Sequence, residues 1–114
     1  MLGCLFCKIV QKQIPSKIVY EDDKCMAFED VNPQAPVHIL IIPKEHIPTI
    51  LDINELHKDI LFDMYAAANK IANERNIANR GFRLVVNCNA EAGQSVFHVH
   101  MHVLGGRHMA WPPG

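Results

Sequence analysis

The chain contains the stretch Phe97-His98-Val99-His100-Met101-His102-Val103, in which every second residue is a histidine. Successive side chains of a β-strand point to opposite faces, so this alternation predicts a strand over residues 97–104. The three histidines then share one face. Val99, Met101 and Val103 share the other face and can enter the core. Gly105 and Gly106 follow directly and end the predicted strand.

Three imidazoles on one face are difficult to explain by packing, and two functional interpretations stay open. Neutral imidazole is a good zinc ligand, so the histidines can form a metal site. Alternatively, one imidazole nitrogen attacks phosphorus while its neighbours orient it and stabilise charge. The preceding polar loop over 89–95 contains Gly93, Gln94 and Ser95. Such a loop can bring backbone N–H groups close to a phosphate, which favours phosphoryl chemistry.

Working outward, the flanking segments predict one α+β domain. A short amphipathic helix is expected at 4–12, before Pro15, and a long helix with apolar residues at three- and four-residue steps at 53–76. Asp52 and Glu55 have the spacing of a capping box for the long helix. Strand-type patterns occur at 17–20, 25–30, 37–42, 82–87 and 97–104. The strands are grouped rather than alternating with helices, which favours a largely antiparallel sheet, with the apolar strand 37–42 at its centre.

Length and composition are typical of a single globular domain over residues 1–114. Hydrophobic residues make up 49% of the chain, charged residues 20%, and the formal net charge is −1. This balance argues against broad electrostatic binding to nucleic acid or to an anionic membrane. No apolar stretch approaches the roughly 20 residues of a membrane-spanning helix. The N-terminus has no basic segment followed by an apolar run, so we expect a cytoplasmic protein with reduced cysteines.

Cys4 and Cys7 form a CxxC pair with the spacing of metal ligands. Three interpretations stay open: a structural zinc site, two buried thiols, or a redox pair. A thioredoxin-like redox pair follows a strand, and no strand is predicted before Cys4. There is no second CxxC, so any further zinc ligands must be histidines. Cys25 and Cys88 are expected to be small core residues, and His57 to lie on the polar side of the long helix.

The segment from Gly93 to Gly106, with its His-x-His-x-His pattern, resembles the signature of the histidine-triad (HIT) family. The similarity covers nearly the whole chain and includes Pro33-Gln34-Ala35-Pro36 and the end Trp111-Pro112-Pro113-Gly114. It is closer to the Hint branch than to the Fhit-like dinucleoside polyphosphate hydrolases. The resemblance implies an α+β, HIT-like fold: a mainly antiparallel sheet of about five strands with one long and one short helix. It also implies a homodimer that joins two sheets.

The activity implied by the resemblance is that of a purine nucleoside phosphoramidase, which cleaves the P–N bond of AMP or GMP phosphoramidates. His100 would be the nucleophile and form a covalent nucleotidyl-histidine. His102 would bind the phosphate, His38 would support the triad, and Ser95 would lie beside the leaving group. No catalytic cofactor is expected. Purine nucleoside monophosphates and their phosphoramidates are the expected ligands.

The nucleotide site implied by the resemblance includes a purine pocket, the contact of Asp30 with the ribose hydroxyls, and a C-terminal tryptophan that reaches toward the partner subunit. Its residues are Phe6, Ile9, Phe28, Asp30, Val31, Asn87, Gly93, Gln94, Ser95, Val96, His100, His102 and Trp111.

The resemblance also supplies two candidates for completing the zinc site. Some family members bind zinc through the N-terminal cysteine pair and two histidines, which correspond here to His46 and His98. Zinc would then be structural. Two rival hypotheses remain: an enzyme in which all three triad histidines hold a metal, and a zinc-stabilised nucleotide- or partner-binding module with little turnover.

Overall fold

The computed structural model describes residues 3–114. Met1 and Leu2, which belong to the N-terminus where no targeting signal is predicted, lie outside the described residues. Its helices are α1 (Leu5–Val10), α2 (Lys58–Glu74) and α3 (Asn89–Ala92), with two 3₁₀ turns, η1 (Ile50–Asp52) and η2 (Glu55–His57). Its strands are β1 (Ile18–Glu21), β2 (Cys25–Glu29), β3 (Val37–Pro43), β4 (Phe82–Val85) and β5 (Met101–Gly105).

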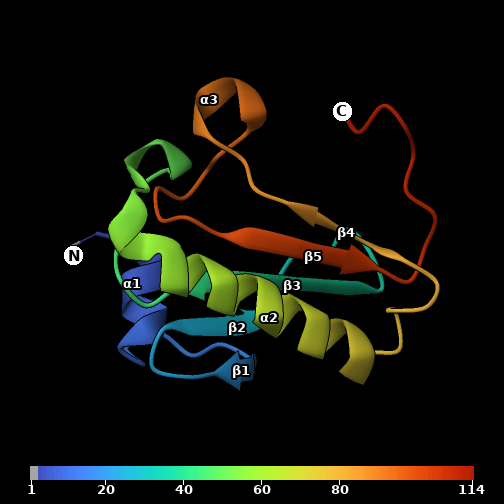
Figure 1. The fold of residues 1–114 in the computed structure, drawn as a ribbon, viewed down its shortest axis with the longest axis horizontal. Helices are drawn as coiled ribbons and strands as arrows, with labels where there is room; N and C mark the ends of the chain where they lie inside the picture. Colours follow the sequence, from blue (N-terminus) through green and yellow to red (C-terminus); the bar gives the residue numbers. More distant parts are fainter. Residues whose placement is uncertain (1–2) are drawn as a thin grey trace.

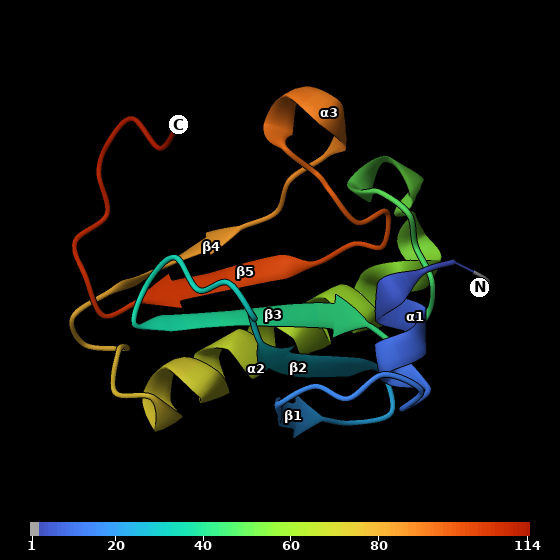
Figure 2. The same cartoon turned by 180° about the vertical axis from the view of Figure 1, so that it is seen from behind.

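The strands form one antiparallel sheet in the order β1-β2-β3-β5-β4 (Figure 1). The predicted α+β class, the five strands and the central position of β3 are confirmed. Helix α2 covers one face of the sheet, in front of it in Figure 1 and behind it in Figure 2. Helix α1 packs against the other face near one end. Each face of β3 therefore contributes to a different hydrophobic cluster.

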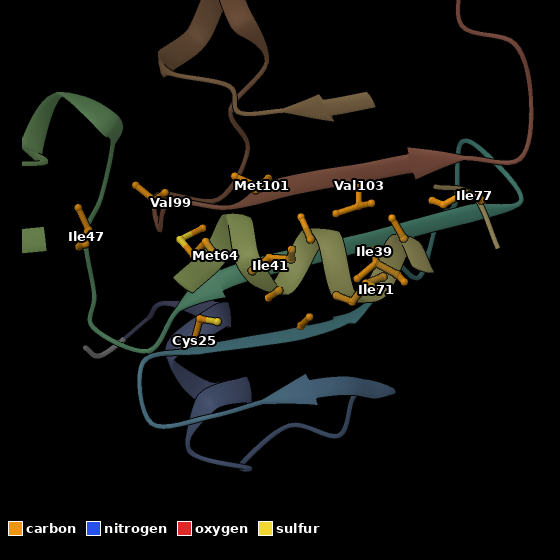
Figure 3. Close-up of a cluster of buried hydrophobic side chains, with 14 residues drawn as sticks. Cys25, Ile39, Ile41, Ile47, Met64, Ile71, Ile77, Val99, Met101 and Val103 are labelled. Atoms are coloured by element: carbon orange, nitrogen blue, oxygen red, sulfur yellow. The ribbon is translucent and has the colours of Figure 1, made fainter. Parts of the chain in front are cut away.

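The main core lies between the sheet and α2. Ile39 and Ile41 of β3 point into it together with Met64 and Ile71 of α2, as Figure 3 shows. Leu40 of β3 points to the opposite face and joins a smaller cluster under α1. This alternation follows from the pleat of the strand. A strand that is apolar on both faces fits its position at the centre of a covered sheet.

The histidine strand begins later than predicted, at Met101 rather than Phe97. The Val99 N–H donates to the Ile47 carbonyl at 2.7 Å, which draws this segment out of the strand ladder. The predicted alternation of side chains nevertheless persists. Val99, Met101 and Val103 are in the main core, whereas His98 and His100 lie edge-on to Phe6 of α1.

The long helix also begins later than predicted, at Lys58. Thr49, and not Asp52, is the N-cap of η1, and Asp52 is its partner in the capping box. Asn54 then caps η2. These side-chain bonds to the backbone stabilise two separate turns instead of a continuous helix. Leu56, one of the apolar residues within the predicted helix 53–76, is consequently 88% exposed.

Four smaller differences concern the surroundings of the site. The strand predicted over 82–87 ends at Val85, and the loop predicted at 89–95 contains α3, which ends at the left-handed Gly93. Cys25 is fully buried as expected, whereas Cys88 is only half-buried. His57 is buried rather than on a polar face, because its ring accepts from the Asn54 N–H and pairs with Glu45. Within residues 3–114, no helix combines the length and the apolarity needed to cross a membrane.

Candidate active site

The buried ring of His100 is held in one tautomer by its own segment. His100 Nδ1 lies 2.8 Å from the His98 carbonyl oxygen. A carbonyl only accepts, so Nδ1 carries the proton and donates it. The neutral ring then has its lone pair on Nε2. The side chain of Phe6 lies edge-on, with ring centroids 5.1 Å apart, and fixes the ring from the α1 side.

A second chain of hydrogen bonds fixes the protons of His38 and His102. The Gln34 backbone N–H donates to His38 Nδ1 at 2.9 Å, so this nitrogen carries no proton. His38 Nε2 is therefore the protonated nitrogen, and it lies 2.9 Å from His102 Nδ1. His102 Nδ1 accepts, which places the proton of the neutral His102 ring on Nε2. Asp30 Oδ2 lies 3.4 Å from His38 Nε2 and helps to hold it.

Burial keeps the His38 and His102 rings neutral. Burial, followed by the neighbouring His100 and His38, lowers the pKa of His102 to about 4. Burial also lowers the pKa of His38, although the Asp30 carboxylate opposes this shift. At neutral pH the two rings are consequently uncharged, as the hydrogen-bond chain requires. The His100 and His102 ring centroids are 5.1 Å apart, so a lone pair and an N–H donor lie on neighbouring rings.

Gln94 uses its side chain to hold the loop rather than to reach into the site. Its Oε1 accepts from the Asn89 N–H at 2.8 Å. Both donors of its Nε2 are occupied, by the Pro48 carbonyl at 2.9 Å and the Val96 carbonyl at 3.1 Å. The residue is buried, and these bonds fix the turn that presents Ser95, whose side chain is exposed.

Some of the residues expected around the nucleotide lie together under α1, and others lie apart from them. Phe6, Ile9 and Phe28 lie together in the cluster under α1, where Phe6 and Phe28 pack edge to face with centroids 5.5 Å apart. Val31 is 100% exposed and Trp111 is 82% exposed, so neither is part of that cluster.

The C-terminal segment forms a separate hollow. Trp111 and Asn87 line a cavity of about 840 Å³ between β4 and the C-terminal segment.

Asp30 lies beside His38, and its Oδ1 accepts from the Asn32 N–H at 2.7 Å. Gly93 ends α3, and Val96 packs against the cluster under α1.

Cys4, Cys7, His46 and His98 form a compact group of potential metal ligands. His98 Nδ1 lies 3.4 Å from Cys4 Sγ, 3.6 Å from Cys7 Sγ and 3.3 Å from His46 Nδ1. Cys7 Sγ lies 3.2 Å from His46 Nδ1. With the usual zinc bond lengths, a tetrahedral ion needs S···N separations of about 3.5 Å and an N···N separation of about 3.3 Å. The donor set and its spacing therefore fit zinc.

The tautomer of His98 is also suited to a metal ligand. Its ring is fully buried, and Nε2 lies 2.7 Å from the Pro43 carbonyl, to which it can only donate. The lone pair is then on Nδ1, which points at the two sulfurs. Burial, followed by the neighbouring Cys4, raises the pKa of the Cys7 thiol, so a cation would be needed to hold its thiolate.

The structure separates the three triad histidines instead of directing them at one ion. Among residues 3–114, His98 groups with the cysteines, His102 groups with Asp30 and His38, and His100 belongs to neither group. The sequence analysis missed the partners that set the tautomers, which are the Gln34 N–H and the Pro43 and His98 carbonyls. The proline-rich segment Pro33–Pro36 was a signal in the sequence for the first of these partners, the Gln34 N–H. The two carbonyls have no signal in the sequence, because every residue carries one.

Comparisons with known proteins agree with this geometry. The model of the HIT domain family matches residues 11–109. The purine nucleoside phosphoramidase of Escherichia coli K12 is 52% identical over 103 residues, which cover 90% of this chain and 87% of that protein.

Solved structures give the same result. A HIT family hydrolase from Legionella pneumophila superposes with a TM-score of 0.96 at 50% identity, covering 98% of this chain and 100% of the other. A histidine triad protein from Clostridium difficile gives a TM-score of 0.92 at 44% identity, covering 96% of both chains. With this match in both sequence and fold, the chain belongs to the HIT family.

Proposed function

We propose that this protein is a purine nucleoside phosphoramidase that hydrolyses the P–N bond of AMP and GMP phosphoramidates through a covalent nucleotidyl-histidine on His100. The observation that carries the proposal is the His100 tautomer, since Nδ1–H bound to the His98 carbonyl leaves a lone pair on Nε2. The similarity to the Escherichia coli phosphoramidase supports the choice of substrate.

In the first step, His100 Nε2 attacks phosphorus. The Nε2–P bond forms while the P–N bond breaks, and the amine leaves with a proton from a neighbouring donor. The ring of His100 becomes positively charged. The His98 carbonyl, 2.8 Å from Nδ1, stabilises this charge without moving. The His102 Nε2–H, fixed by the His38 chain, is the donor expected to bind a phosphate oxygen.

In the second step, water attacks the same phosphorus and the Nε2–P bond breaks. The water proton is lost to solvent or to a neighbouring base, and the nucleoside monophosphate leaves. His100 returns to its starting tautomer because the His98 carbonyl has held the Nδ1 proton throughout. The site therefore needs no cofactor for either displacement.

The test is to mix the enzyme with an adenosine phosphoramidate, quench it within milliseconds, and locate the adduct by peptide mass spectrometry. We expect an adenylyl group on the peptide that contains His100, both with and without a chelator. An adduct that disappears on chelation, while the protein stays folded, would support the metal-dependent alternative. AMP binding with neither adduct nor turnover would support the binding-module alternative.

We also propose that Cys4, Cys7, His46 and His98 hold a structural zinc ion. The ion would tie α1 to the segment before β5 and supply no step of the reaction. The test is metal analysis and thermal unfolding of Cys7→Ser, with Cys88→Ser as the matched control, since Cys88 is outside the group. Zinc content and unfolding temperature should fall only in the first variant. Such thiol ligands suit the reducing cytoplasm, which is where we place the protein.

The proposed assembly is a homodimer in which the two sheets join at β4. This strand is at the edge of the sheet and pairs only with β5 among the described residues, so one side of its backbone is open. Pairing with a second copy would satisfy these groups and bring the exposed Trp111 toward the partner subunit. Sedimentation velocity measures the outcome directly, and a monomer at micromolar concentration would contradict the proposal.

A further inference from the structure

The four arginines of the chain lie around one hollow, although they are spread from residue 75 to residue 107. Arg75, Arg80, Arg83 and Arg107 all line a cavity of about 520 Å³. It is formed where the C-terminal end of α2, the start of β4 and the turn after β5 meet. Figure 1 shows this end of the sheet on the side away from α1 and α3. We call this cavity the arginine pocket.

The charge of the arginine pocket contrasts with that of the whole protein. The chain has a net charge of −1, yet none of the described residues that line the pocket is acidic. Within residues 3–114, Arg75 is the single arginine with an ion pair, to Glu29 at 3.1 Å. With Arg75 paired to Glu29, the lining keeps three arginines that have no ion pair among the described residues, and a bound anion would offset their positive charge.

Two of the guanidinium groups are held in place by backbone carbonyls. Arg83 Nη2 donates to the Ala110 carbonyl at 3.0 Å. Arg107 donates from Nε to the Gln34 carbonyl at 3.0 Å and from Nη1 to the His108 carbonyl at 2.9 Å. An arginine has five donors, so both groups keep N–H donors for a ligand. Holding the side chains in advance reduces the entropy lost on binding.

The floor of the arginine pocket is closely packed. A Cβ added at Gly105 would lie 2.6 Å from Ile77 Cδ1, and one added at Gly106 would lie 2.9 Å from Pro36 Cβ. Only glycine allows β5 to approach the α2–β4 turn and the start of β3 this closely. Phe82 and Arg83 of the lining belong to β4, so in the proposed homodimer this wall of the cavity lies beside the partner subunit.

We propose that the arginine pocket binds a compact polyphosphate group. Guanidinium groups match phosphate oxygens with paired hydrogen bonds, and several of them together favour a ligand with more than one negative charge. The cavity volume suits a small ligand. The group can come from free inorganic pyrophosphate or from the phosphates of a nucleoside diphosphate. This site is independent of the proposed function, because it shares no residue with the catalytic histidines.

The test is a titration followed by two-dimensional ¹H–¹⁵N NMR, with sodium pyrophosphate as the probe and sodium chloride at matched ionic strength as the reference. Saturable shifts are expected for the amides of residues 75–83 and 105–109 and for the arginine Nε–H groups. A second titration with ADP distinguishes the sources when it is followed at the amides of residues 75–83 and 105–109, since tighter binding of ADP there would identify a nucleotide. Shifts confined to residues 93–102, or equal shifts with chloride, would overturn the proposal.

Two matched variants test whether an arginine of the pocket contributes to pyrophosphate binding. Arg80→Gln removes an exposed arginine of the pocket, whereas Lys58→Gln removes the same charge at the start of α2. We expect Arg80→Gln to weaken pyrophosphate binding about tenfold, as the loss of one charged hydrogen bond does, and Lys58→Gln to change it less than about twofold. Both variants should keep their phosphoramidate turnover. Equal losses in the two variants would show general electrostatic attraction and contradict a specific pocket.

Discussion

His98 and His100 are two residues apart in one motif, yet their rings carry protons on opposite nitrogens. His98 donates from Nε2 to the Pro43 carbonyl and turns Nδ1 toward two sulfurs. His100 donates from Nδ1 to the His98 carbonyl and keeps Nε2 free. The first region has the features of a metal site and the second those of a nucleophile. The comparison shows that the acceptor near each ring, rather than the motif, decides what a histidine can do.

The sharpest way to test this comparison is the substitution His100→Gln. The amide removes the nucleophilic nitrogen, so we expect kcat/KM for an adenosine phosphoramidate to fall on the order of 10⁴-fold. The unfolding temperature should change little, because glutamine keeps a polar group near the His98 carbonyl. Steady-state kinetics and calorimetry measure the two effects. Residual activity within tenfold of wild type would exclude His100 as the nucleophile.

The substitution His98→Gln should have the reverse effect. It removes a zinc ligand and a buried hydrogen bond, and we expect the unfolding free energy to fall by more than about 3 kcal/mol. Urea unfolding with metal analysis measures this. At a temperature where the variant is still folded, its kcat should stay closer to wild type than that of His100→Gln. If His98→Gln abolished turnover without losing zinc or stability, the division of roles would be wrong.

A smaller effect is expected at His38, which acts through His102 as a positioning residue. His38→Phe removes the Nε2–H that faces His102 Nδ1, so His102 is no longer held with its proton on Nε2. We expect kcat to fall roughly 10- to 100-fold. His38→Gln places an amide N–H near the same position and should recover part of the loss. Similar kinetics for the two variants would indicate that His38 only fills space.

The last prediction concerns stability at low pH. Burial, together with His100 and His38, lowers the pKa of His102 to about 4, against about 6.5 in an unfolded chain. As the pH falls, the unfolded chain takes up this proton first. The stabilisation is therefore fully present above pH 6.5 and is lost between about pH 6.5 and pH 4.

Urea unfolding at several pH values measures this loss. The variant His102→Gln should show a shallower decline than wild type, and His108→Gln, at an exposed position, should not. The decline should not vanish, because burial also lowers the pKa of His38 and His98. An unchanged slope in His102→Gln would contradict a neutral, buried His102.

Much of the fold was predictable because local patterns decide it. The apolar run of β3, the steps of α2 and the alternation of Val99, Met101 and Val103 identified the central strand, the long helix and the core face. The errors occurred at element ends. Competing caps at Thr49 and Asn54 shortened the helix, and a hydrogen bond to Ile47 removed residues 97–100 from the strand.

The sequence identified the histidines and cysteines that the structure brings together, but not the different environment of each ring. The sequence by itself determined which side chains can act as nucleophile, donor and metal ligand, because residue type fixes their chemistry. Only the tertiary structure decided the protonation of each ring, the use of Gln94 as a loop support and the convergence of four arginines. These features depend on distances between residues far apart in the chain, and spacing along a sequence does not specify such distances.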